Sequence, residues 1–544
     1  MILKKLLPLV LLTLLTLNSN IFACTNFLIS KGASVDGSTM ITYAADSHVL
    51  YGELYYTPPG KHLPGEMLDI YEWDTGKYLG QIKQAARTYS VVGNMNEHQV
   101  SIGETTYTGR EDLINPEGIM DYGSLMYIAL QRAKTAREAI QVMTDLVAEY
   151  GYYSSGESFS VADPNEVWIF EIIGKGPKNK GAVWVARKVP DGYICAHANQ
   201  SRIHQFPLND KENCLYAKDV ISLAREKGYF KGEDKDFSFA NAYAPPDYGA
   251  LRFCEARVWQ MFRRAAPSLN LSIDYVKGEK GAEPLPLWIK PDKKLSVQNV
   301  MELMRDHFEG SEFDLSKGIG AGPYCLPYRW RPLTWSVDST QYLNERATST
   351  QQTGFSFVAQ ARSWLPDPIG GVFWFGVDDT YSTVYIPIYC SIREVPKPYA
   401  VGTGHFDEFS WDSAFWVFNF VSNYAYSRYC DMIKDIQKVQ RQFESQFLAD
   451  QPAIDNAAQE LYKQSPGLAV DYLTNYSVNC GETVVKRWKK LGEFLIYKYL
   501  DGNMKNELGE VKHPGYPKAW YQRIVDEDGE QLKMKKLEGE TGTH

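Results

Sequence analysis

Several common signatures are missing from this 544-residue sequence. Its eight cysteines are scattered and form no Cys-x-x-Cys pair, so neither a zinc ribbon nor a dense disulfide framework is predicted. Its nine histidines include no His-Glu-x-x-His motif and no pair at ligand spacing, so a catalytic metal is not expected. No run of basic residues stands out and the formal net charge is -9, which disfavours a nucleic-acid partner.

Long apolar runs are also scarce. Beyond the N-terminal leader, no stretch approaches the ~20 apolar residues that are needed to span a bilayer. The leader carries Lys4 and Lys5, then an apolar run over residues 6–17, and it closes on the small residue Ala23. This pattern is typical of a secretory signal peptide. We therefore predict that residues 1–23 are removed and that the mature protein is periplasmic or extracellular, with no membrane span.

Cleavage after Ala23 would make Cys24 the first residue of the mature chain. Such a cysteine carries a free α-amine with a pKa near ~8 beside a thiol with a pKa near ~8.5. The amine can accept the thiol proton close to neutral pH, so Cys24 is a candidate nucleophile. The alternative is a lipoprotein with a lipid on the Cys24 sulfur; Ile21 and Ala23 fit such a signal, whereas the bulky Phe22 does not.

A β-hairpin is predicted directly after Cys24. Residues 25–30 and 39–43 have strand character, and Asp36-Gly37 between them has turn chemistry. Folding this hairpin would return Asp46 to within a residue or two of the position opposite Cys24. A carboxylate there can hold the α-ammonium and orient the thiol, although Asp46 could equally be a surface residue that ends a strand.

Further motifs follow in a fixed order along residues 24–402. They occupy residues 24–28, 32–39, 45–47, 93–97, 103–105, 162–166, 168–171, 197–202, 251–257, 370–378 and 385–389. In this order they resemble the secernin-like cysteine dipeptidases of peptidase family C69, members of the N-terminal nucleophile (Ntn) hydrolase superfamily. The resemblance implies an exported dipeptidase that cleaves small peptides through a thioester on Cys24. Its general base would be the α-amine of Cys24, and it would need no cofactor.

The secondary-structure pattern indicates an α+β fold. Residues 125–150 have helical periodicity that is broken only at Thr135, and strand-like runs follow at residues 158–161, 167–173 and 183–187. The resemblance makes this a four-layer αββα sandwich, the Ntn-hydrolase fold, over residues 24–404. Residues 411–447 and 453–500 are mostly helix-forming, so residues 405–544 are predicted to be a helical C-terminal extension.

Amide cleavage passes through a tetrahedral oxyanion, which requires hydrogen-bond donors near Cys24. Asn199 matches the position at which related N-terminal cysteine acylases place an asparagine beside the nucleophile, which makes it a candidate ligand of the oxyanion or of the α-amine. The alternative is a turn asparagine after a strand. The second oxyanion asparagine of the acylases has no counterpart, because this chain has Glu104-Thr-Thr106 there. That donor is left unassigned, with Thr106 as a candidate.

The acylases also carry an active-site arginine in a Ser-Arg-Phe sequence, which Arg252-Phe253 fits best, with Arg257 five residues further on as the other candidate. A guanidinium near Cys24 would favour the thiolate, although both arginines could instead form ion pairs on a helix surface. The Arg-Asn-x-Asp opening that is common in relatives is replaced by residues 43–46, Tyr-Ala-Ala-Asp, which leaves the substrate preference open.

Two rival functions remain open at this point. One is a non-peptide amidase on the same fold, such as a bile-salt or penicillin acylase. The other is a lipid-anchored surface binding protein. The sequence does not identify the counter-charge for the free amine or carboxylate of a dipeptide, and it does not indicate an oligomeric state. If the base were a histidine rather than the α-amine, the candidates would be His98, His197 and His204.

Overall fold

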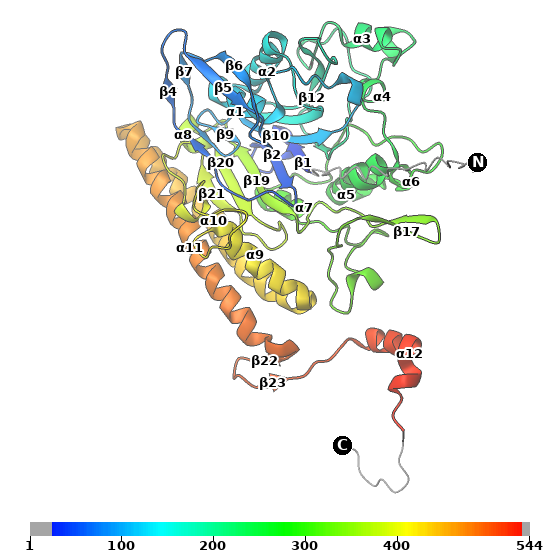
Figure 1. Cartoon of the computed structure of the whole chain (residues 1–544). Coiled ribbons are helices and arrows are strands. Elements are labelled where there is room, and N and C mark those ends of the chain that lie inside the picture. The colour runs from blue at the N-terminus through cyan, green and yellow to red at the C-terminus, as the bar shows by residue number, and fades with distance from the viewer. Residues whose placement is uncertain (1–23, 536–544) are drawn as a thin grey trace, which may run out of the picture.

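The computed structural model describes residues 24–535, so the predicted signal peptide lies outside the described residues. Two large antiparallel sheets form the centre of the molecule (Figure 1). The mixed α and β composition that the sequence predicts is confirmed.

The first sheet has seven strands, and β1 and β2, the predicted hairpin, lie near its middle. All eight residues of β2 are buried, because other elements cover both faces of this sheet. In spatial order the strands are β16 (Trp288–Ile289), β14 (Ile194–His197), β1 (Asn26–Ile29), β2 (Thr39–Asp46), β19 (Thr353–Ala361), β20 (Val372–Val377) and β21 (Ile386–Tyr389).

The second sheet has eight strands and faces the first, with β1 and β2 in contact with its central strands. Its order is β15 (Cys214–Tyr216), β13 (Ala182–Lys188), β12 (Val167–Gly174), β11 (Gly156–Ala162), β10 (Ser101–Tyr107), β9 (Met95–Asn96), β8 (Val91–Val92) and β3 (Tyr56–Thr57). Four small ribbons pair β4 (Gly60–Lys61) with β7 (Arg87–Thr88), β5 (Met67–Tyr71) with β6 (Tyr78–Lys83), β17 (Thr334–Val337) with β18 (Thr340–Leu343), and β22 (Met504–Lys505) with β23 (Val511–Lys512).

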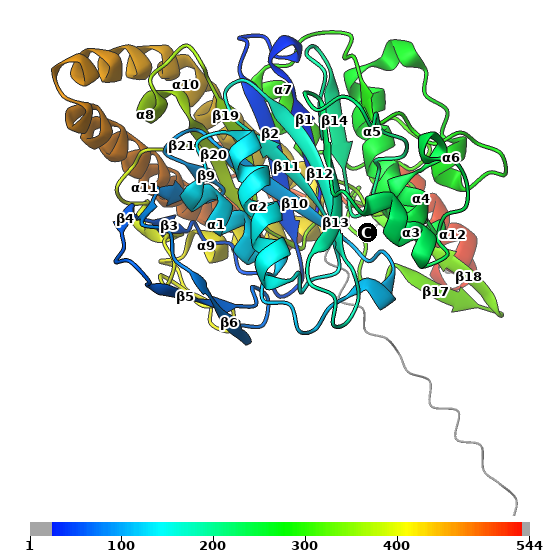
Figure 2. The same ribbon diagram turned by 90° about the horizontal axis from the view of Figure 1, so that it is seen from above.

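Helices flank both sheets (Figure 2). Helices α1 (Tyr122–Arg132) and α2 (Ala136–Tyr150) pack on the eight-stranded sheet, and α5 (Ala256–Ala265) and α7 (Val297–Met304) contact the seven-stranded sheet. The predicted break at Thr135 is confirmed, because the Thr135 side chain caps α2 by accepting a hydrogen bond from the Glu138 amide. Shorter helices are α3 (Val220–Glu226), α4 (Phe239–Tyr243), α6 (Asp274–Lys277) and α8 (Asp367–Gly370).

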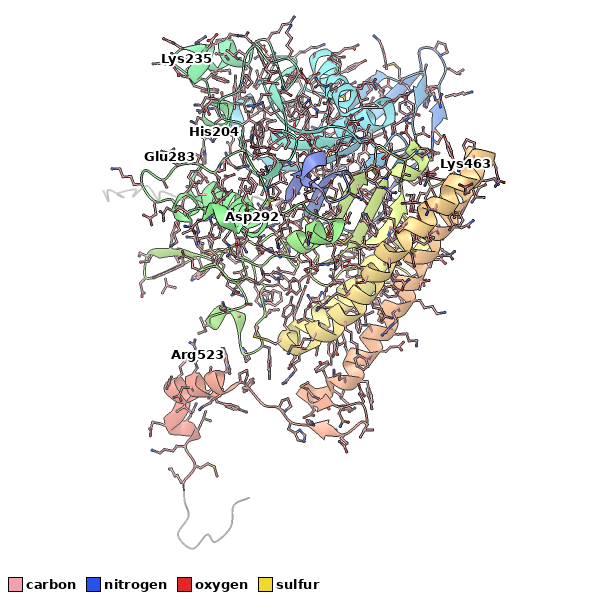
Figure 3. All side chains as sticks on the ribbon, turned by 180° about the vertical axis from the view of Figure 1, so that it is seen from behind. His204, Lys235, Glu283, Asp292, Lys463 and Arg523 are labelled. Carbon is pink, nitrogen blue, oxygen red and sulfur yellow. A yellow bond between two sulfur atoms is a disulfide. The ribbon has the colours of Figure 1, made fainter. Side chains whose placement is uncertain are left out.

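The C-terminal segment contributes α9 (Ala414–Ala425), α10 (Tyr429–Gln464), α11 (Pro466–Lys498) and α12 (Lys518–Leu532). Helices α10 and α11 pack against each other in a long hairpin, with Lys463 near its turn (Figure 3). Helix α9 contacts β20 and α11 contacts β21, whereas α12 buries none of its residues. Within residues 24–535, none of the helices combines the length and the apolar character that are required to cross a bilayer.

The sequence places the two helix-forming runs at residues 411–447 and 453–500, with a gap between them. That gap is wrong, because α10 runs without a break through Pro452. A proline inside a helix removes one backbone hydrogen bond and costs about 3 kcal/mol. Asp455 and Ala458, just beyond it, are buried against the rest of the molecule. Their burial and the ion pair of Asp455 with Arg362 hold the second half of α10 in line with the first.

Two buried ion pairs and one disulfide join α10 to earlier parts of the chain. Glu444 accepts hydrogen bonds from both terminal nitrogens of Arg305, at 2.5 and 3.0 Å, and Asp455 forms an ion pair with Arg362. A disulfide joins Cys325 to Cys430, with 5.6 Å between the Cα atoms. The other six cysteines are free, so the described residues contain one disulfide and no dense disulfide framework.

The Arg305–Glu444 pair leads to a stability prediction. Glu444→Ala would leave the buried Arg305 guanidinium without its buried counter-charge, so we expect the free energy of unfolding to fall by about 3–5 kcal/mol. Glu302→Ala is the matched control, because Glu302 contacts the same guanidinium at 3.4 Å but has a side chain that is 48% exposed. Its loss should cost at most about 1 kcal/mol. Urea unfolding followed by circular dichroism measures both, and equal losses would contradict the prediction.

Candidate active site

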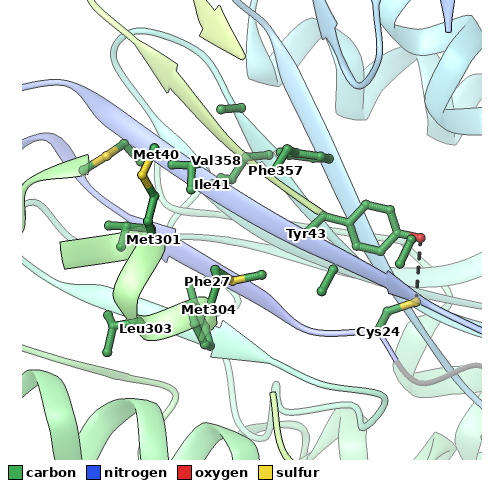
Figure 4. Packing of buried hydrophobic residues seen from close by; sticks show 14 of the residues in the cluster. Cys24, Phe27, Met40, Ile41, Tyr43, Met301, Leu303, Met304, Phe357 and Val358 are labelled. Carbon is green, nitrogen blue, oxygen red and sulfur yellow. Dashed lines mark hydrogen bonds between the residues drawn. The ribbon is translucent and has the colours of Figure 1, made fainter. Parts of the chain in front are cut away.

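Cys24 lies at the entrance to β1 and beside the end of β2, because Thr25 bridges to Ala44. It is 5% exposed. Its Sγ atom lies 3.7 Å from the Tyr43 hydroxyl oxygen and 3.7 Å from Oε1 of Glu104, and Figure 4 shows the sulfur directed at the Tyr43 hydroxyl. The thiol is therefore enclosed by polar groups that the hairpin and β10 supply.

A small pocket opens beside Cys24. Its walls come from the end of β2, from β10, from the first turns of α1 and from the turn that follows β5. Both Cys24 and Asp46 line it, together with Glu104, Asp74 and several aromatic rings. The hairpin thus brings Cys24 and Asp46, which the sequence predicts to lie near each other, into one cavity.

Asp46 is buried and held by two partners. One carboxylate oxygen forms an ion pair with Arg346, and the other accepts a hydrogen bond of 2.6 Å from the Thr353 hydroxyl. Burial raises the pKa of Asp46 to about 6, against the opposing effects of the Arg346 charge and the Thr353 hydrogen bond. A carboxylate in this position can change its charge close to neutral pH.

Arg257, on α5, is the guanidinium that contacts the Cys24 backbone. Its Nη1 atom donates to the Cys24 carbonyl and, at 2.6 Å, to the Thr25 hydroxyl. Its Nη2 atom donates to the Ala198 carbonyl at 3.2 Å and to Oδ1 of Asn199 at 2.9 Å. Being only 1% exposed, Arg257 fixes the start of β1 and the end of β14 in one position.

Arg252, which the sequence favoured over Arg257, lies elsewhere. Its guanidinium forms an ion pair with Glu345 and stacks over the Phe313 ring, with 4.6 Å from Cζ to the ring centroid. It belongs to a π-helical turn, Ala250–Glu255, that leads into α5. Of the two arginines, Arg257 is the one whose guanidinium contacts Cys24.

Asn199 lies close to Cys24 through Arg257 rather than by direct contact. It adopts a left-handed backbone conformation, with φ 58°, just after β14. Its Oδ1 atom accepts from Arg257, and its Nδ2 atom donates to the Thr106 carbonyl at 2.7 Å. One Nδ2 hydrogen remains beyond this bond, and the role of Asn199 as an oxyanion donor stays a prediction.

Glu104 is a site residue that the sequence does not predict. In the sequence it is only a departure from the acylase pattern, yet its Oε1 atom lies 3.7 Å from the Cys24 sulfur and accepts a hydrogen bond from Tyr43. Burial raises the pKa of the Cys24 thiol well above its ordinary value, and the charges of Glu104 and Asp46 raise it further. Thr106, the candidate second donor, gives its hydroxyl hydrogen to Glu157 at 3.0 Å.

The three histidines that are candidates for a general base contact other groups than Cys24. His197 is fully buried between the Thr105 and Ser160 hydroxyls, at 2.7 and 2.8 Å, and burial lowers its pKa to about 3. His98 pairs with Asp367, and His204 contacts Ser238. Within residues 24–535, no histidine makes a hydrogen bond to the Cys24 sulfur, and no group of three or more His, Cys, Asp or Glu side chains is placed to hold a metal ion.

The chain matches a known family of peptidases over most of its length. The model of peptidase family C69 matches residues 62–442. The chain belongs to peptidase family C69. The family resemblance that the motifs indicate is thereby confirmed, and a family of peptide hydrolases is established for this chain. Cys24 lies ahead of the residues that the family model matches.

Proteins similar to this member of family C69 include a probable dipeptidase of Latilactobacillus sakei, 24% identical over 398 residues that cover 69% of this chain and 76% of that protein. A probable dipeptidase of Salmonella dublin is 25% identical over 398 residues, covering 69% and 82%. Probable dipeptidase B of Streptococcus pyogenes serotype M1 is 22% identical over 505 residues, covering 89% and 95%. The similarity to this streptococcal protein covers more residues than lie within 1–404, so it extends into the C-terminal helices.

The contacts of Arg257 lead to a test of the two arginines. Arg257→Lys should lower turnover by at least ~10²-fold, because a lysine cannot hold the Cys24 carbonyl and Asn199 at the same time. Arg252→Lys is the matched control and should change turnover by less than about tenfold. Steady-state kinetics with a dipeptide measures both variants at equal folded concentration. A larger loss in Arg252→Lys than in Arg257→Lys would restore the sequence-based choice.

The pKa of Asp46 leads to a pH prediction. We expect kcat/KM to fall as the pH drops through about 6, because protonated Asp46 can balance neither Arg346 nor an α-ammonium at Cys24. The pKa in the folded state lies above the ~3.9 of an unfolded aspartate, so proton uptake by Asp46 stabilises the fold between these values. Activity should therefore be lost at a higher pH than any acid unfolding seen by circular dichroism.

The variant Asp46→Asn should lower turnover at least ~10²-fold and abolish the fall of kcat/KM near pH 6. If the variant kept this fall, another group would be responsible for it.

Proposed function

We propose that this protein is a cysteine dipeptidase that hydrolyses small peptides with Cys24 as its N-terminal nucleophile. The observation that carries the proposal is the position of Cys24, at the edge of a pocket, with its backbone fixed by Arg257 and with Asp46 in the same cavity. The names of the relatives, all probable dipeptidases, support a dipeptide as the substrate.

In the proposed reaction, the α-amine of Cys24 accepts the thiol proton and the sulfur attacks the scissile carbonyl. The carbon–sulfur bond forms, and the resulting oxyanion is stabilised by donors that include Asn199. The amine returns the proton to the leaving amino group as the carbon–nitrogen bond breaks, which leaves a thioester. Water then attacks the thioester, the amine takes a proton from the water, and the freed sulfur regains it. Asp46 holds the α-ammonium during these steps.

The two facing sheets, with helices in contact with each, support the assignment of residues 24–404 to the four-layer αββα sandwich of the Ntn hydrolases. Residues 405–544 form the helical extension in this proposal. Export after removal of residues 1–23 is part of it too, because only cleavage before Cys24 exposes the amine. The Cys325–Cys430 disulfide supports an oxidising compartment outside the cytoplasm.

The two rival functions give different expectations at Cys24. A diacylglycerol group on the sulfur would need space and an apolar exit, whereas Cys24 is 5% exposed and lies against Tyr43 and Glu104. An acylase on the same fold would retain the nucleophile and differ in its substrate. A panel of dipeptides and acyl-amides separates the peptidase from the acylase, and mass spectrometry of the mature N-terminus identifies a lipid.

The N-terminus supplies the decisive test. A recombinant chain that keeps one extra residue before Cys24 should fold but lose nearly all activity, because an amide nitrogen cannot accept the thiol proton. Removal of that residue with a site-specific protease should restore activity. Cys24→Ser with a free N-terminus should retain at most a trace, because a hydroxyl is far less acidic than a thiol. Full dipeptide hydrolysis by the extended chain, at equal folded concentration, would reject the N-terminal nucleophile.

A further inference from the structure

The pocket beside Cys24 is lined by carboxylates without a cation to match them. Asp46, Asp74 and Glu104 all line it, and its lining contains no lysine and no arginine. Asp46 is balanced by Arg346. Neither Glu104 nor Asp74 forms an ion pair among residues 24–535, so the cavity next to the nucleophile carries uncompensated negative charge.

Glu104 is the most demanding of these carboxylates. It is 2% exposed, and within residues 24–535 the donor left for its Oε2 atom is the neighbouring, fully buried carboxyl of Glu157. Burial and the Glu104 charge raise the pKa of Glu157 well above its ordinary value, so Glu157 keeps its proton and the pair carries the single negative charge of Glu104. A buried carboxylate in this state is costly unless a cation reaches it. The open side from which a cation can come is the pocket.

The distance from Glu104 to the nucleophile indicates which cation fits. In a peptide, the α-nitrogen of a residue lies about 2.5 Å from the carbonyl carbon of the same residue. A sulfur that attacks the first carbonyl of a dipeptide therefore has the free α-ammonium within a few ångströms. Oε1 of Glu104 lies 3.7 Å from the Cys24 sulfur, so it is close enough to contact an ammonium bound at that distance.

We propose that Glu104 binds the α-ammonium of the substrate, so that the enzyme acts on small peptides with a free amino end and rejects those whose amino end is blocked. This inference rests on the proposed function, since it assumes that Cys24 attacks the first peptide carbonyl. Tyr43, which donates to Oε1 of Glu104, positions the carboxylate toward the sulfur. Asp74 lies on the exposed turn after β5, hydrogen-bonded to the Tyr122 hydroxyl at 2.8 Å, and adds negative charge at the pocket rim.

The same contact links binding to reactivity. The negative charge of Glu104 raises the pKa of the Cys24 thiol, and a bound ammonium offsets that charge. A peptide with a free amino end would therefore favour the thiolate that attacks it. A blocked peptide would bring no such charge and would also lose the contact with Glu104.

The first experiment uses the wild-type mature protein and needs no variant. We expect kcat/KM for L-Ala-L-Ala to exceed that for N-acetyl-L-Ala-L-Ala by at least ~10²-fold, which is the scale for removing one partner of a buried charge pair. Equal hydrolysis of both peptides would overturn the inference. If both are hydrolysed and Cys24→Ala abolishes both activities, the proposed function survives while the inference fails. If Cys24→Ala leaves hydrolysis intact, the proposed function itself fails.

Two isosteric variants separate ammonium binding from a structural role of the acid pair. Glu104→Gln removes a charge that acts on the Cys24 thiol with either substrate, so the measured quantity is the ratio of kcat/KM for L-Ala-L-Ala to that for the N-acetyl peptide, which should fall about 10²-fold. Glu157→Gln removes the neighbouring buried carboxyl but keeps the Glu104 charge, so the ratio between the two substrates should stay within threefold of wild type. Glu226→Gln, on the exposed end of α3, controls for the substitution itself.

Three other results would count against the inference. Equal losses for both substrates in Glu104→Gln would indicate that Glu104 serves the α-amine of Cys24 rather than the substrate. A loss of the substrate ratio in Glu157→Gln as large as in Glu104→Gln would indicate a structural pair. A retained ratio in a folded Glu104→Gln would remove Glu104 from substrate recognition altogether.

Discussion

The site depends on one buried guanidinium. Arg257 reaches from α5 to the carbonyl of Cys24, the hydroxyl of Thr25 and the loop that carries Asn199, and it is almost fully enclosed. A planar group with five donors can hold these acceptors in one fixed arrangement. Desolvation and the nearby Arg346 charge lower the pKa of Arg257 to about 9, so its positive charge depends on the acceptors and carboxylates around it. Cys24 is thus positioned by a residue that is 233 positions away in sequence.

The local parts of this site could be predicted from sequence because they rest on neighbouring residues. Strand patterns and a turn were sufficient to propose that Asp46 returns to Cys24, and β1 and β2 do pair as a hairpin. The helix break at Thr135 was predictable for the same reason, since a cap is a local signal. The partners of Asp46 were not predictable: Arg346 and Thr353 lie 300 or more residues away and reach it only through the pairing of β2 with β19.

The choice between Arg252 and Arg257 could not be made from spacing alone. The π-helical turn before α5 changes the direction in which successive side chains point, and no residue type announces such a turn. Glu104 was visible as a departure from the pattern of related acylases, but its meaning depends on what surrounds it. A glutamate on a strand is ordinary, whereas Glu104 is buried beside the Cys24 thiol and next to a second buried glutamate, Glu157, and these neighbours come from other parts of the chain.

The packing of α9 and α11 on β20 and β21 has a consequence for the order in which the protein is made. Both strands are buried along their whole length, and Trp488 of α11 stacks on Phe418 of α9 in the same hydrophobic core that includes Cys24. A ribosome releases residues 414–498 only after every strand of the two large sheets has emerged. Until then, the part of β20 and β21 that these helices cover stays open to water and to other chains. Shortening the chain at residue 404 would therefore expose these strands and remove part of the core itself.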